Sequence, residues 1–267
     1  MNGKKLRLGL IGKDVSKSLS EEMHTFILSA FGVQCSYQRF SVGRDAFDDT
    51  MRVLMGDFDA FNVTIPYKRD VFAYLNEISD EAMQCGAVNT VITQTGVGYS
   101  TDGAGFLLML QTSGVEVSGK RVLVLGVGGA GRSVAVALKN AGAQVYLYRR
   151  NKEELQEACQ QLGVLAADSP TQGGFDILIN CTGVGMHDTE GVSPVDESAF
   201  VGASVAVDLI YHPKQPKFLQ IADALGLKTV NGESMLFYQA YYADCLFLDK
   251  SPDVEEAKNL YARYVAQ

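Results

Sequence analysis

Short apolar runs alternate with amphipathic stretches along nearly the whole chain. In residues 19–31, the apolar side chains Met23, Phe26, Ile27 and Ala30 recur at the spacing of a helix. Short runs rich in branched and aromatic residues predict strands instead. In the first part of the chain, strands are expected over 6–11, 36–41, 58–63 and 87–93, with a turn over 95–98, and helices over 19–31, 46–55 and from Pro66 onward.

A second series of the same kind begins after Asp102. It predicts strands over 121–125, 144–148, 176–180 and 204–209, with helices over 105–112, 129–141 and 152–162. Such alternation is typical of βαβ units, whose strands pair in a parallel sheet. Residues 234–248 predict a helix that is apolar on nearly all sides and therefore buried, and residues 255–265 predict a more polar last helix.

These elements predict an α/β fold with two domains. Residues 1–103 are expected to form a small N-terminal α/β domain, and residues 104–233 a Rossmann-type, doubly wound sheet. The C-terminal helices, within residues 234–267, are expected to return to the first domain, because the apolar helix needs a covering surface. A length of 267 residues suits two modest domains.

Composition excludes several classes of partner. The net charge of −8 argues against nucleic acid and anionic membranes, though not against an anionic small molecule. We expect no membrane-spanning helix, and no secretory leader in residues 1–12. Five scattered cysteines without a C-x-x-C pair and three widely spaced histidines predict neither a disulfide framework nor a metal site. A cytoplasmic protein with reduced thiols is expected.

A glycine-rich turn follows the apolar run of residues 122–125. Its sequence, Gly126-Val127-Gly128-Gly129-Ala130-Gly131, has G-x-G-x-x-G spacing, and a helical pattern follows it. In that position the glycines allow a tight turn and a close approach of backbone N–H groups to a pyrophosphate, which the positive end of the helix also attracts. The turn predicts a dinucleotide-binding site rather than a merely tight connection.

The end of the next strand distinguishes the two nicotinamide cofactors. NAD sites usually place Asp or Glu there, about 20 residues beyond the glycines, to hold the ribose 2′-hydroxyl. Here the strand ends in Arg149 and Arg150. A guanidinium suits a 2′-phosphate, so the sequence favours NADP, with NAD not excluded. In the alternative interpretation both arginines are solvated or pair with Glu153 and Glu154.

Polar residues of the first domain lie where strands end and helices begin, which is where α/β sheets carry their sites. Ser18 and Ser20 start the first helix, either as N-cap residues or as two hydroxyls that hold a carboxylate or a polyol. Asn62 and Thr64 face the same side of a strand end. Lys68, one turn after Pro66, reaches the same space as a candidate acid/base.

Three further polar residues accompany them. Asn89 places an amide within an otherwise buried strand. Asp102 either caps the following helix or pairs with Lys68. Gln239 lies inside the most apolar helix, where a polar side chain needs a partner in the protein or in a ligand.

Together these segments resemble the shikimate dehydrogenase family over nearly the whole chain and in the same order. Each matching segment alone is only modest evidence, but all of them together, in the same order along the chain, are specific for this family. The matching segments are Ser18-Leu19-Ser20 with His24, residues 62–68 (N-V-T-I-P-Y-K), 86–90 (G-A-V-N-T), Thr101-Asp102 with Gly105-Phe106, the glycine-rich turn, residues 180–186 (N-C-T-G-V-G-M), 208–211 (D-L-I-Y), and Met235-Leu236 with Gln239-Ala240.

The resemblance implies interconversion of 3-dehydroshikimate and shikimate with NADP(H), in aromatic amino-acid (chorismate) biosynthesis. It implies that residues 1–103 are the substrate-binding domain, that residues 104–233 are the NADP-binding, dinucleotide-binding domain, and that Lys68 and Asp102 are the catalytic pair. The implied substrate-binding residues are Ser18, Ser20, Asn62, Thr64, Lys68, Asn89, Asp102, Tyr211 and Gln239. The implied cofactor-binding residues are Gly126, Val127, Gly128, Gly129, Ala130, Gly131, Arg149, Arg150, Thr182, Met186 and Gly232.

Three alternatives stay open. The first is a quinate or quinate/shikimate dehydrogenase that uses NAD or either cofactor. The second is a non-catalytic, ligand-sensing homologue, against which the intact Lys68–Asp102 pair argues. The third is a folate-pathway dehydrogenase of similar architecture, although paired serines and amides suit a polyhydroxylated acid better than a pterin. The sequence is compatible with a monomer or a homodimer.

Overall fold

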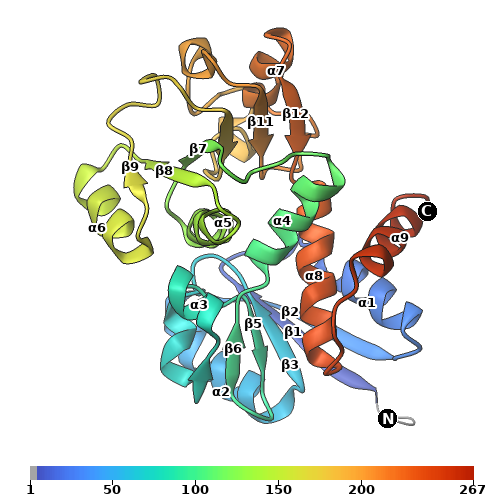
Figure 1. Cartoon of the computed structure of the whole chain (residues 1–267). Coiled ribbons are helices and arrows are strands. Elements are labelled where there is room, and N and C mark those ends of the chain that lie inside the picture. Colours follow the sequence, from blue (N-terminus) through green and yellow to red (C-terminus); the bar gives the residue numbers. More distant parts are fainter. Residues whose placement is uncertain (1–4) are drawn as a thin grey trace. The chain divides into compact units, whose positions relative to one another are not determined.

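The computed structural model describes residues 5–267 and contains two α/β units (Figure 1). Unit 1 comprises the residues up to Gly105 together with Phe237–Gln267, and unit 2 comprises Phe106–Leu236. The sequence placed the corresponding boundaries at residues 103 and 233. Residues 1–4, with which the N-terminal domain was expected to begin, lie outside the described residues. The C-terminal helices belong to unit 1, and so return to the N-terminal domain.

Unit 1 is built on a mixed six-stranded sheet with the order β2-β1-β3-β5-β6-β4. Its strands are β1 (Leu6–Gly12), β2 (Cys35–Ser41), β3 (Ala60–Val63), β4 (Glu77–Ile78), β5 (Thr90–Ile92) and β6 (Val97–Tyr99). β1 pairs in parallel with β2 and β3, whereas β5 pairs antiparallel with both β3 and β6. The turn predicted over 95–98 is wrong by two residues: it occupies residues 93–96 and joins β5 to β6 as a hairpin. So short a connection can only return the chain antiparallel.

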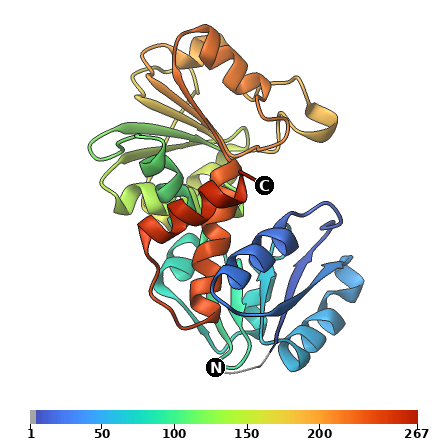
Figure 2. The same cartoon turned by 90° about the vertical axis from the view of Figure 1, so that its right-hand side faces the viewer.

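Helices cover both faces of this sheet. They are α1 (Ser20–Ala30), α2 (Phe47–Asp57), α3 (Asp80–Cys85), the start of α4 (Asp102–Thr112), most of α8 (Glu233–Phe247) and α9 (Val254–Tyr264), with 3₁₀ helices η1 (Arg44–Ala46) and η2 (Asp70–Tyr74). Successive side chains of β1 point to opposite faces. Leu10 packs with Leu28 of α1 and with Phe247 of α8, whereas Ile11 packs with Met51 of α2. Figure 2 shows α8 and α9 (red) beside α1 (blue).

The helix predicted from Pro66 is absent, and residues 65–69 form turns before η2. A helix would use the carbonyl oxygens of these residues for its own hydrogen bonds. Here Ile65 O accepts from the Lys13 N–H, and Lys68 O accepts from the Val88 N–H. Neighbouring segments therefore anchor the turn that carries Lys68.

Unit 2 has a six-stranded sheet, all parallel, in the order β12-β11-β10-β7-β8-β9. Its elements are β7 (Arg121–Leu125), α5 (Gly129–Asn140), β8 (Gln144–Tyr148), α6 (Lys152–Leu162), β9 (Leu165–Ala166), β10 (Ile177–Asn180), η3 (His187–Thr189), η4 (Glu197–Phe200), β11 (Val205–Asp208), α7 (Lys217–Ala224) and β12 (Lys228–Asn231). The strand order reverses at β7, which is the switch point where doubly wound sheets bind ligands. The predicted fold class is confirmed, although β9, α7 and β12 were not predicted.

Candidate active site

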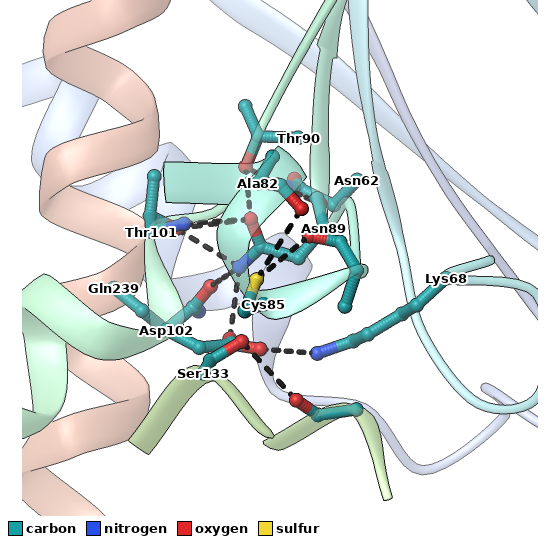
Figure 3. Close-up of polar contacts among 12 residues, drawn as sticks. Asn62, Lys68, Ala82, Cys85, Asn89, Thr90, Thr101, Asp102, Ser133 and Gln239 are labelled. Atoms are coloured by element: carbon teal, nitrogen blue, oxygen red, sulfur yellow. Dashed lines mark hydrogen bonds and ion pairs between the residues drawn. The ribbon is translucent and has the colours of Figure 1, made fainter. Parts of the chain in front are cut away.

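The Lys68 amine and the Asp102 carboxylate form an ion pair inside unit 1 (Figure 3). Lys68 lies in the turn after β3, and Asp102 is the first residue of α4. Lys68 Nζ is 2.5 Å from Asp102 Oδ2, and the two side chains are only 13% and 8% exposed. A lysine held beside a carboxylate can give a proton as the ammonium, or take one as the neutral amine, at a fixed position.

The side chain of Asn89 joins this pair to two other elements. Its Nδ2 lies 2.8 Å from Asp102 Oδ1, 2.9 Å from Thr101 Oγ1 and 3.2 Å from Gln239 Oε1. Its Oδ1 accepts from the Thr101 N–H at 2.9 Å. One oxygen of Asp102 therefore binds Asn89 and the other binds Lys68, which fixes the direction of the carboxylate.

Gln239 comes to this cluster on the apolar helix α8. Gly105 of α4 lies against it: a Cβ built at Gly105 would be 2.6 Å from Gln239 N and 2.9 Å from Gln239 Cα. No side chain fits in that space, so α4 and α8 approach this closely because residue 105 is glycine. The amide of Gln239 finds a partner in Asn89.

Asn62 is enclosed at the end of β3. Its Oδ1 accepts from the Tyr37 hydroxyl at 2.9 Å, and its Nδ2 lies 3.3 Å from both Asn89 O and Thr90 Oγ1. Both ends of this amide thus bind protein groups around the cluster. Thr64, two residues later, is half-buried.

Ser18 and Ser20 form a separate pair at the start of α1. The N-cap position falls on Leu19, which makes no side-chain cap. Ser18 Oγ donates to Ser20 Oγ at 2.9 Å and accepts from the Ser20 N–H at 3.2 Å. Neither serine is therefore the N-cap residue considered from the sequence. Two adjacent hydroxyls are suited to binding a carboxylate.

In unit 2, the glycine-rich turn connects β7 to α5. Gly126 has a φ of 101°, which glycine adopts at no steric cost. A Cβ at Gly131 would lie 2.3 Å from Gly126 O, so the turn closes this tightly only with glycine there. The N-cap of α5 is Gly128, which has no side chain to bind the first N–H groups of the helix. Those N–H groups and the helix dipole favour an anion at this end.

Arg149 and Arg150 follow β8 directly. Arg149 Nη1 forms an ion pair with Glu154 Oε2, and both side chains are more than one-third exposed. Asn151 caps α6 by accepting from the N–H groups of Glu153 and Glu154. The alternative interpretation, an arginine paired with an acid of the next helix, therefore holds for Arg149 and Glu154.

Thr182 lies against the glycine-rich turn. A Cβ at Gly126 would be 3.0 Å from Thr182 Cγ2. Thr182 N and Oγ1 both donate to Asn180 Oδ1, at 3.0 and 2.7 Å, which fixes the start of this loop. Met186 lies further along the same loop, where Met186 Cε would be 3.3 Å from a Cβ at Gly183.

Tyr211 and Gly232 lie on neighbouring loops of unit 2. Tyr211 follows β11, and burial raises the pKa of its hydroxyl. Asp208 ends β11, and burial raises the pKa of its carboxyl to about 6 although it accepts two hydrogen bonds. A Cβ at Gly232 would be 2.3 Å from Leu209 O, so the loops after β11 and β12 pack directly together. Tyr211 is thus the one predicted substrate-binding residue that belongs to unit 2.

Sequence reasoning missed three buried side chains of the cluster: Tyr37, Thr90 and Thr101. In β2, Tyr37 is buried while most residues of that strand are not. An aromatic residue within a polar strand would have indicated burial. It would not have identified Asn62, 25 residues away, as the partner.

The fold and the site together define a class. A mixed-sheet unit that holds a sheltered lysine–carboxylate pair is joined to a doubly wound unit with a G-x-G-x-x-G turn at its switch point. That combination is typical of NAD(P)-dependent oxidoreductases with a separate substrate domain. Among residues 5–267, no group of His, Cys, Asp and Glu side chains could hold a metal ion, and no helix is long and apolar enough to cross a membrane.

Comparisons with known proteins identify the family. Residues 10–91 match the shikimate dehydrogenase substrate binding domain, and residues 100–171 match the D-isomer specific 2-hydroxyacid dehydrogenase, NAD binding domain. The shikimate dehydrogenase (NADP(+)) of Carboxydothermus hydrogenoformans is 37% identical, over 97% of both chains. The chain belongs to the shikimate dehydrogenase family, which confirms the resemblance seen in the sequence.

Two solved structures extend this result. Shikimate 5-dehydrogenase from Thermus thermophilus, in complex with NADP(H) and shikimate, has a TM-score of 0.88 and 35% identity, covering 97% of this chain and 99% of that one. Shikimate 5-dehydrogenase from Listeria monocytogenes, in complex with shikimate and NAD, has a TM-score of 0.83 and 26% identity, covering 98% of each chain. The fold of both units is therefore the fold of this family.

Proposed function

We propose that this chain catalyses the reversible, NADP-dependent reduction of 3-dehydroshikimate to shikimate, a step of aromatic amino-acid biosynthesis. The observation that carries the proposal is the sheltered Lys68–Asp102 pair, completed by Asn89 and Gln239, in a member of the shikimate dehydrogenase family. Relatives described as shikimate dehydrogenase (NADP(+)) are 33–37% identical to it over most of its length.

Lys68 handles the proton of the reaction. When the carbonyl of 3-dehydroshikimate is reduced, its oxygen gains negative charge, and the Lys68 ammonium donates a proton to it. In the reverse direction the neutral amine of Lys68 takes that proton from the hydroxyl. Asp102 holds Nζ in place, while Asn89 holds Asp102. NADPH supplies the hydride when it is bound.

The remaining polar groups of unit 1 are assigned to the substrate. Ser18 and Ser20 bind its carboxylate through their paired hydroxyls, with Thr64 as a further donor. Asn89 and Gln239 bind ring hydroxyls, together with Lys68 and Asp102. Asn62 is assigned to the substrate as a neighbour of Asn89, and Tyr211 is assigned to it from the family resemblance alone.

The residues of unit 2 fit a dinucleotide that carries a 2′-phosphate. A Cβ built at Gly128 meets nothing within 4 Å, so the turn leaves open space beside the N–H groups of α5. The residues Gly126 to Gly131 bind the pyrophosphate there. Arg149 and Arg150 bind the 2′-phosphate, because a guanidinium fork matches phosphate oxygens. Thr182, Met186 and Gly232 complete the cofactor site.

The test is the appearance of reduced nicotinamide from shikimate and NADP⁺, run beside NAD⁺ and beside quinate. Turnover that prefers shikimate and NADP⁺ supports the proposal. A preference for quinate or NAD⁺ keeps the chemistry of Lys68 but overturns the assigned substrate or cofactor. Absence of turnover in a folded protein that still binds shikimate points to a ligand-sensing homologue.

Gly105→Ala is expected to lower kcat/KM for shikimate by about tenfold or more, with KM for NADP⁺ unchanged. The added methyl group would collide with the backbone of Gln239 and shift α8 away from Asn89. Initial rates with varied shikimate and varied NADP⁺ measure both constants. Gly56→Ala is the control, since a Cβ at this exposed helical position meets nothing within 4 Å. Equal kcat/KM for the two variants would contradict the assigned position of Gln239.

A further inference from the structure

Tyr37 is a buried residue of β2 that the reaction described above does not use directly, although the Ser20 side chain is a hydrogen-bond neighbour of its hydroxyl. Its hydroxyl donates to Asn62 Oδ1 at 2.9 Å, and the residue is 8% exposed. Burial raises the pKa of this phenol well above its ordinary value, so the hydroxyl keeps its proton as a donor.

A continuous series of hydrogen bonds leads from Tyr37 to the catalytic pair. Asn62 Nδ2 donates to Thr90 Oγ1, Thr90 Oγ1 donates to Asn89 Oδ1, and Asn89 Nδ2 donates to Asp102 Oδ1. Lys68 binds the other oxygen of Asp102. Figure 3 shows the part of this series from Asn62 to Lys68.

Backbone groups fix the direction of these bonds. The Thr101 N–H can only donate, so Asn89 Oδ1 must face it and Asn89 Nδ2 must face Asp102. The carbonyl of Asn89 can only accept, so Asn62 Nδ2 must face it. Asn62 Oδ1 therefore faces Tyr37, whose hydroxyl must be the donor. Hydrogen bonds aligned in one direction polarise and strengthen one another.

The ring of Tyr37 is itself held in place. It stacks on His24 of α1, with ring centroids 5.0 Å apart and an interplanar angle of 15°. His24 Nδ1 in turn binds Asp244 Oδ1 of α8 at 2.7 Å, and both of these side chains are buried. The phenol thus has a fixed position relative to Asn62.

We propose that Tyr37 is a positioning residue for the reaction, and that it acts on the Lys68–Asp102 pair through Asn62, Thr90 and Asn89. The inference rests on the proposed function, because it needs a turnover to measure. Without the hydroxyl, Asn62 Oδ1 is left buried without its donor. The aligned hydrogen bonds from Asn62 through Thr90 to Asn89 lose their first member and weaken, so Asn89 holds the carboxylate of Asp102 less firmly.

The test is Tyr37→Phe, which removes the hydroxyl and keeps the ring stacked on His24. With shikimate and NADP⁺, kcat is expected to fall by about tenfold, with KM for NADP⁺ within about twofold of the wild-type value. Tyr241→Phe is the matched control: Tyr241 is also buried in unit 1, and its hydroxyl donates to Asp253 O and Glu256 Oε2. The control is expected to lower the melting temperature without lowering kcat.

A second measurement separates positioning from a loss of stability. In an Asn89→Ala background the series is already broken, so Tyr37→Phe is expected to lower kcat no further. The same fall in kcat with and without Asn89 would overturn the inference, as would a kcat for Tyr37→Phe equal to that of Tyr241→Phe. Either result leaves the proposed function intact when the wild type turns over shikimate. Absence of turnover in the wild type instead overturns both proposals.

Discussion

Lys68→Ala is expected to lower kcat for shikimate oxidation by about 10²–10⁴-fold, with little change in KM. The hydroxyl of shikimate must lose its proton as the hydride leaves, and Lys68 is the sheltered base placed beside Asp102. Water reaching the vacated position is a poorer and less oriented acceptor. Steady-state rates of NADPH formation, with shikimate and NADP⁺ varied in turn, measure the change.

Two further variants test whether the fall in kcat is specific for the loss of the Lys68 amine. Lys68→Arg keeps a cation next to Asp102 but holds its proton too firmly for acid/base exchange, so kcat is expected to stay low. Arg69→Ala removes the neighbouring, exposed cation and is expected to leave kcat within about twofold of the wild type. A Lys68→Ala protein that keeps the wild-type kcat would show that Lys68 takes no part in the reaction.

The sequence predicted unit 2 more closely than unit 1, because local signals mark its elements. The predicted bounds of β7, β8 and α6 are those observed. Helix α6 begins directly after Asn151, whose side chain caps it, and ends at Leu162, directly before Gly163, whose φ is 62°. Such signals act within a few residues, so they can be read along the chain.

Unit 1 depends more on partners that are distant in the sequence. The turn at residues 65–69 replaces a helix because Lys13 and Val88 bind its carbonyl oxygens. No local pattern at Pro66 contains that information. The antiparallel pairing of β5 with β6 follows instead from the short hairpin between them, whose turn was placed two residues too late.

In the candidate site, too, local motifs identify residues, whereas contacts between distant residues appear only in the structure. Motif spacing named Lys68, Asn89, Asp102 and Gln239 and raised the pairing of Lys68 with Asp102. It did not give the contact of Asn89 with Gln239, which lies 150 residues away. The helix contact at Gly105, which brings Gln239 to the cluster, also required the structure. Side chains without a motif, such as Tyr37, were invisible because their role is defined only by what they touch.

Arg149→Ala is expected to raise KM for NADP⁺ by about 10–100-fold and KM for NAD⁺ by less than about threefold. Charge-assisted hydrogen bonds from a guanidinium to the 2′-phosphate are lost, and NAD⁺ has no such phosphate. Measuring kcat/KM for NADP⁺ and for NAD⁺ at saturating shikimate gives the preference between the two cofactors directly. Similar rises for NADP⁺ and NAD⁺ would mean that Arg149 supports the loop after β8 rather than the phosphate.

Glu154→Ala should change the preference between NADP⁺ and NAD⁺ in the opposite direction, toward NADP⁺. In this structure the Glu154 carboxylate competes with any phosphate for Arg149, and it adds a negative charge close to that position. Its removal frees the guanidinium, so KM for NADP⁺ should fall while KM for NAD⁺ changes little. Glu157→Ala is the matched control, because it removes an equal charge from α6 at a residue that binds Gln161 instead of Arg149. Opposite effects at Arg149 and Glu154, with none at Glu157, would establish that the ion pair after β8 sets the preference between the two cofactors.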